Sequence, residues 1–117
     1  MRALRWLLPL PWAKTTAPRA EAGLTAAGTG DDRIKAVVSR GGRVELAETA
    51  LPGVKAPTLL IVGENDVPVL NLNRGIAVEF TTEVKLEIVR GASHLFEEPG
   101  ALDQVATRAG DWYERHF

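Results

Sequence analysis

Asp66 and His94 are the two residues of this chain whose type and position best suit them to chemistry. Each follows a strand-like apolar run: residues 56–62 precede the carboxylate, and residues 84–89 precede the imidazole. In an open parallel sheet, ligands and catalysis gather at the carboxyl ends of the strands. Two neighbouring strands would then hold a carboxylate beside an imidazole, which are the charge partner and the proton shuttle of a hydrolytic triad.

Each of the two residues also has an ordinary structural explanation. An aspartate between a strand and a helix commonly caps the helix N-terminus, and a loop histidine is often only solvated or hydrogen-bonded. The pair is more specific than either member, because one helix separates the two strands and a right-handed crossover makes such strands neighbours. Their order also fits triads in which serine, acid and base follow one another along the chain. We therefore favour the catalytic interpretation.

The elements that must position this pair alternate along the chain. Apolar, β-branched runs predict strands at residues 34–38, 58–62 and 84–89. Helical patterns are expected at residues 19–27, 69–80 and 98–116, with a short helix at best at 44–50. This alternation predicts a three-layer α/β fold, with a parallel sheet and helical crossovers. The apolar spacing predicts which helical residues are buried, namely Leu72, Ile76 and Phe80, then Leu102, Val105, Ala109, Trp112 and His116.

Composition excludes several classes of function. The 117 residues suffice for one domain, with 45% hydrophobic and 25% charged residues. A net charge of -1 argues against a nucleic-acid binder. The absence of cysteine excludes thiolate metal sites and a cysteine nucleophile. No metal or cofactor is predicted.

Residues 1–18 form a separate apolar segment that we expect to be irregular. A positive start and a short apolar stretch hint at a signal peptide, but Arg5, Pro9 and Pro11 interrupt it. No run approaches the roughly 20 apolar residues of a membrane-spanning helix. We therefore predict a cytoplasmic protein with no membrane or nucleic-acid partner.

Three stretches, residues 34–43, 55–66 and 86–100, resemble the C-terminal part of an α/β-hydrolase of the dienelactone hydrolase-like group. The second ends in Gly63-Glu64-Asn65-Asp66, and the third contains Ser93-His94-Leu95-Phe96. The resemblance covers about residues 19–117, which would form a partial α/β-hydrolase domain. It implies that Asp66 is the triad acid and His94 the general base, acting on an ester, thioester or lactone.

The nucleophile that the resemblance implies is not evident. The group places a serine in G-x-S-x-G, where small neighbours allow a sharp turn between strand and helix. The chain has two serines. Ser93 adjoins His94, which is poor geometry for attack, and Ser39 has Val37 where a small residue is needed. Thr16 lies near the expected elbow, but a threonine nucleophile normally requires a dedicated base or a free amine.

Two functional hypotheses follow. The first is a hydrolase-family protein with acid and base present, for which Ser39 and Thr16 are weak candidate nucleophiles. The second is a catalytically inactive, truncated homologue, or a subunit that binds a partner, either as a homodimer or with a missing hydrolase half. An open sheet edge would invite such pairing, and we expect the segment Trp6–Trp12 or a second copy to cover it. We expect the isolated chain to have little esterase activity.

Overall fold

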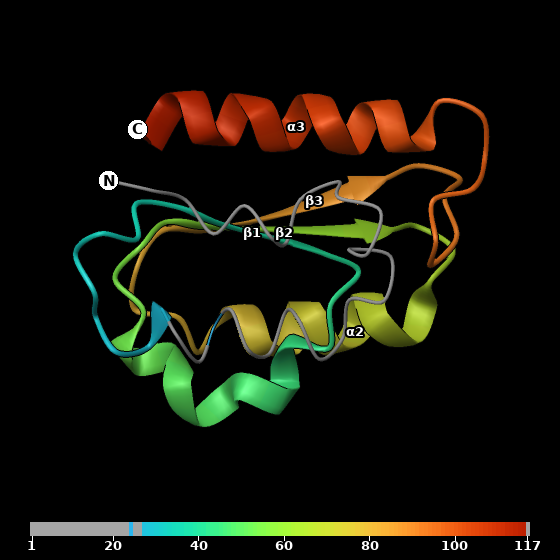
Figure 1. Ribbon diagram of the computed structural model, residues 1–117. Helices are drawn as coiled ribbons and strands as arrows, with labels where there is room; N and C mark the ends of the chain where they lie inside the picture. Colours follow the sequence, from blue (N-terminus) through green and yellow to red (C-terminus); the bar gives the residue numbers. More distant parts are fainter. Residues whose placement is uncertain (1–23, 25–26, 117) are drawn as a thin grey trace.

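Three parallel strands form the middle layer of the computed structural model, which describes Leu24 and residues 27–116. β1 (Val37–Arg40), β2 (Thr58–Gly63) and β3 (Val84–Val89) lie side by side in that order. In Figure 1, α3 (Ala101–His116) covers one face of the sheet, whereas α2 (Val67–Ala77) and the 3-10 helix η3 (Val44–Gly53) cover the other. The predicted three-layer parallel fold is confirmed.

The central strand β2 explains why the sequence shows an apolar run without alternation. All six of its residues are buried, and successive side chains of a strand point to opposite faces. Leu60 packs in the cluster shared with η3 and α2, whereas Leu59 and Ile61 pack in the cluster beneath α3. Burying one such side chain stabilises the fold by about 1.5–3 kcal/mol, so β2 joins the two halves of the core.

Two strands match their predicted ranges closely, but the first does not. β1 spans Val37–Arg40 instead of residues 34–38, and Ile34 makes only an isolated bridge. The shift follows from pairing, because Val37 lies opposite Thr58 and Arg40 lies opposite Ile61. Ser39, one residue beyond the predicted strand, is therefore a strand residue.

Two residues predicted to be buried on helices are exposed. Leu72 is 38% exposed, because the buried stripe of α2 runs through Val69 and Asn73 instead. Leu102 is 46% exposed, because Ala101 occupies the inward position at the start of α3. In both helices the predicted buried position is wrong by one residue, which is a rotation of about 100° around the helix axis.

The predictions for the N-terminal residues fall mostly on residues that the structure does not describe. Residues 1–18, including Thr16 and the segment Trp6–Trp12, lie outside it, so the domain boundary stays a prediction. Of the helix expected at residues 19–27, Leu24 and Ala27 are described, and both are helical. No helix within the described residues is long and apolar enough to cross a membrane.

Candidate active site

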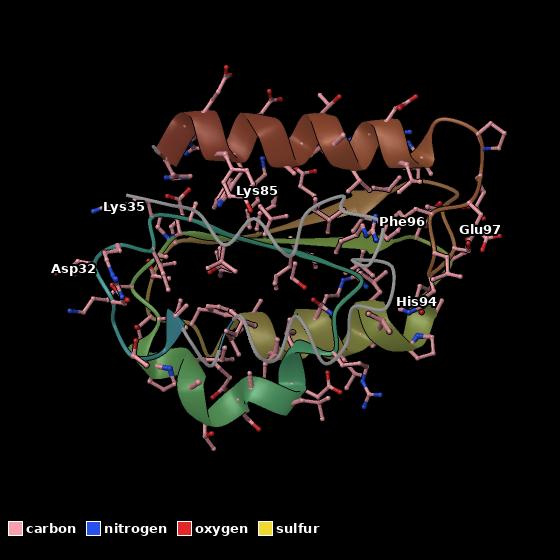
Figure 2. All side chains as sticks on the ribbon, viewed as in Figure 1. Asp32, Lys35, Lys85, His94, Phe96 and Glu97 are labelled. Atoms are coloured by element: carbon pink, nitrogen blue, oxygen red, sulfur yellow. The ribbon has the colours of Figure 1, made fainter. Side chains whose placement is uncertain are left out.

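Two loops at the carboxyl end of the sheet form the candidate site. β2 and β3 end in register, with Gly63 opposite Val89. Beyond this point the loops stay hydrogen-bonded, because Glu64 N donates to Val89 O at 2.9 Å and Asn65 N donates to Ala92 O at 3.0 Å. Figure 2 shows His94 at this end of the molecule, far from Asp32 and Lys35 at the other. The hydrogen bonds between the two chain segments thus continue past the strands and reach the loops that carry Asp66 and His94.

Gly63 allows the two loops to approach so closely. A Cβ atom built on Gly63 would lie 2.7 Å from Ser93 O and even closer to Ala92 O. Real Cβ atoms essentially never approach heavy atoms within 3.0 Å. The loop that carries His94 therefore packs on bare backbone at the end of β2.

Asp66 and His94 are in direct contact. Asp66 Oδ2 lies 2.6 Å from His94 Nδ1. A carboxylate at neutral pH only accepts hydrogen bonds, so Nδ1 carries the proton and donates it. The Asp66 side chain is only 10% exposed, whereas that of His94 is 45% exposed. With the proton on Nδ1, the neutral form of the ring presents Nε2 as a proton acceptor.

The capping role considered for Asp66 is not what its side chain does. Asp66 is the N-cap residue of α2, yet its side chain makes no capping hydrogen bond. Its backbone carbonyl accepts the first helical hydrogen bond, from Leu70 N at 2.8 Å. The residue therefore starts the helix through its backbone and orients His94 through its side chain.

Three further residues, which sequence reasoning missed, fasten the His94 loop. Phe96 is 1% exposed and has a φ of 55°, an uncommon left-handed conformation that tight packing must hold. Glu98 accepts a hydrogen bond from Ser93 N at 3.0 Å, and Glu64 accepts one from Gly91 N at 2.9 Å. The Ser93 N–H holds the pKa of the Glu98 carboxyl below its ordinary value. The loop is thus fixed on both sides of His94.

The loop after β1 supports the ring of His94 from another side. Gly41 has a φ of 60°, and a Cβ atom on it would lie 3.5 Å from His94 Nδ1. Gly41 therefore lies beside the imidazole, with space for about one methyl group between them. Asn73, in the second turn of α2, donates through Nδ2 to Gly42 O at 3.0 Å. Asn73 also escaped sequence reasoning, although its polar side chain in a buried helical stripe was a usable signal.

The candidate nucleophiles do not join the pair within the described residues. Ser39 is fully buried in β1, and its Oγ has no hydrogen-bond partner there. Thr16 lies outside the described part. Asp66 is the hydrogen-bond partner of the His94 ring, and no described serine or threonine hydroxyl bonds to that ring. No group of three potential metal ligands occurs among the described residues.

Comparisons with known proteins give two kinds of relative, while no model of a protein family matches the chain. Two proteins of Mycobacterium tuberculosis, from strains CDC 1551 and H37Rv, each named "Putative phosphoribosyl transferase", are 50% identical over 98 residues. The match covers 84% of this chain but 22% of each of them. The crystal structure of a dienelactone hydrolase from Anabaena variabilis is 48% identical with a TM-score of 0.84, covering 86% of this chain and 47% of that one.

The chain therefore has the fold of part of a dienelactone hydrolase, an α/β-hydrolase, as the sequence resemblance predicted. It spans about half of that solved chain and about a fifth of the curated relatives it matches.

Proposed function

We propose that this segment supplies the acid and the base of serine-type hydrolysis of an ester, thioester or lactone. The observation that carries the proposal is the 2.6 Å contact between Asp66 Oδ2 and His94 Nδ1 at the carboxyl end of a parallel sheet. In this role Asp66 fixes the tautomer of His94 and stabilises its cation. His94 Nε2 is then free to receive the proton of an attacking hydroxyl.

The proposed reaction follows the usual balance of a covalent hydrolase. The hydroxyl oxygen attacks the carbonyl carbon while its proton passes to His94 Nε2. The tetrahedral intermediate collapses, the bond to the leaving group breaks, and His94 returns the proton to that group. Water then repeats the sequence on the acyl-enzyme. The hydroxyl and the oxyanion donors must come from residues outside the described part, or from another chain.

The alternative proposal is a non-catalytic homologue, or a subunit whose partner provides the nucleophile. It is favoured by Ser39, whose Oγ is buried without a described partner and makes no bond to His94. Phosphoribosyl transfer is not proposed for this segment. The name of the Mycobacterium proteins describes chains of which the matched part is only 22%.

A chimera tests the proposal most directly. Residues 24–116 would replace the matched segment of the Anabaena dienelactone hydrolase, which supplies the rest of a hydrolase. Hydrolysis of an activated ester should stay within roughly tenfold of the parent enzyme. His94→Ala or Asp66→Ala in the chimera should then lower turnover on the order of 10³-fold or more. The matched control, His116→Ala, removes the other histidine of the chain and should leave turnover unchanged.

Two outcomes would reject the catalytic proposal. One is a folded chimera without turnover, and the other is turnover that survives His94→Ala. The isolated chain should hydrolyse the activated ester no faster than the buffer does. Copurification of this chain with a serine-bearing partner, and turnover only in the mixture, would instead support the subunit alternative.

A further inference from the structure

We propose that Asn73 is a positioning residue for His94, acting through the Gly41–Gly42 loop. This inference rests on the proposed function, since it concerns how the proton acceptor of that site is held. Asn73 touches neither Asp66 nor His94 in any hydrogen bond of the described structure. Its effect is carried by the backbone that it binds.

Asn73 is an unusual residue for its place in the core. It is fully buried and continues the inward stripe of α2 that includes Val69 and Ile76. Its Nδ2 donates to Val69 O at 2.9 Å and to Gly42 O at 3.0 Å, whereas its Oδ1 is buried without a described partner. An apolar side chain at this position would avoid burying that unsatisfied oxygen. The amide is therefore explained by the hydrogen bond to Gly42, its one long-range hydrogen bond among the described residues.

Gly42 and its neighbour connect this hydrogen bond to the ring. Gly41 N donates to Ile61 O at 2.7 Å, which ties the loop to the end of β2. With Gly41 in a left-handed conformation, the side of the residue where a Cβ would stand faces the ring and carbonyl of His94, at 3.4–3.5 Å from that position. The ring thus has the Asp66 carboxylate at Nδ1 and the Gly41–Gly42 loop beside it.

Both the Asp66 carboxylate and the Asn73 amide are positioned by α2. Asp66 begins α2, and Asn73 lies seven residues later, which is two helical turns. A movement of α2 would therefore shift the carboxylate and the loop together, keeping the ring in register with both. A side chain in position 73 without donors leaves Asp66 in place but removes the hydrogen bond to Gly42, so that the loop is held by the bond from Gly41 N to Ile61 O.

The test uses the whole chain and ring NMR of its two histidines. In the wild type, the His94 Nδ1 proton should give one hydrogen-bonded signal that exchanges slowly with water. Asn73→Asp keeps the shape but removes both donors, and Asn73→Leu removes all polarity. In both variants, this proton should exchange at least about tenfold faster, because a loosened ring opens more often to water. His116 is the internal reference and should not change.

Asn71→Asp is the matched control, because Asn71 is exposed on the same helix. It should leave the His94 signal unchanged. A His94 proton that is equally protected in a folded Asn73→Asp or Asn73→Leu variant would overturn the inference. Gly41→Ala provides an independent route, because it strains the loop and leaves Asn73 intact; an unaffected His94 proton there would also overturn it.

The same variants in the chimera separate this inference from the proposed function. Asn73→Asp should lower kcat by about 10- to 100-fold with little change in KM, as expected for a misplaced catalytic group. An active chimera that is indifferent to Asn73→Asp would refute the positioning role alone. An inactive chimera whose His94 proton still responds to residue 73 would refute the hydrolase function alone.

Discussion

Gly63→Ala is the sharpest test of how the His94 loop is placed. Gly63 ends β2, and its φ lies outside the left-handed range, so its backbone conformation is open to any residue. The substitution therefore introduces no backbone strain of its own. Its whole effect comes from a methyl group directed at two carbonyl oxygens of the loop.

The size of the effect follows from the distances. The new Cβ would lie 2.7 Å from Ser93 O, whereas ordinary contacts begin at 3.4 Å. The loop must retreat by at least about 0.7 Å, and by more at Ala92 O, which stretches the 3.0 Å hydrogen bond from Asn65 N to Ala92 O beyond useful length. Overpacking costs about 1–3 kcal/mol, and a lost hydrogen bond costs about 0.5–1.5 kcal/mol. We expect a loss of about 2–4 kcal/mol of unfolding free energy.

Urea unfolding and thermal melting measure this loss. For a domain of 117 residues, about 1 kcal/mol corresponds to roughly 3–6 °C in melting temperature, so a decrease on the order of 10–20 °C is expected. Gly75→Ala is the matched control, because it makes the same change in the last turn of α2 with nothing within 4 Å of the new methyl. It should stabilise the chain by about 0.4–1 kcal/mol.

The comparison of Gly63→Ala with the wild type decides whether the His94 loop packs closely on β2. If Gly63→Ala melts at the wild-type temperature and retains a protected His94 Nδ1 proton, the close packing of the loop on β2 is refuted. If Gly75→Ala also destabilises, the space around residue 75 is filled, and the loss in Gly63→Ala cannot be assigned to the loop alone.

Three further predictions concern the supports of the site and the helix behind it. Phe96→Ala should cost about 3–5 kcal/mol in urea unfolding, because it empties a fully buried position beneath α3; a loss below about 1 kcal/mol would contradict the packing. Glu98 has a folded pKa below its ordinary value of 4.5, so its contribution to stability is complete above that pH and is lost as the pH falls through the lower folded pKa. Unfolding free energy measured at pH 5 and pH 3 should thus fall less in Glu98→Gln than in the wild type, and an equal fall would show that the hydrogen bond from Ser93 N does not form. Gly110→Ala, within α3 and with nothing within 4 Å, should raise stability by about 0.4–1 kcal/mol; a decrease would mean that this face of α3 is covered.

The sequence was sufficient to predict the pair but not its supports. Asp66 and His94 could be placed together because each follows a clear strand, and parallel strands joined by one helix are usually neighbours. Asn73, Glu98 and Phe96 could not be assigned, because their roles depend on which backbone atoms they meet across the fold. The predicted burial of Leu72 was wrong for a related reason. Apolar periodicity shows that the helix has a buried face, but packing against β2 and η3 decides which residues lie on that face.

The side-chain choice of Asp66 has a local cause that lies two residues further along the chain. An N-cap side chain normally accepts a hydrogen bond from the N–H of the second or third helical residue. The second residue of α2 is Pro68, which has no N–H. One of the two usual capping donors is therefore absent, while the imidazole of His94 lies within 2.6 Å and offers a donor. Proline after the aspartate thus favours the carboxylate turning away from the helix and towards the ring.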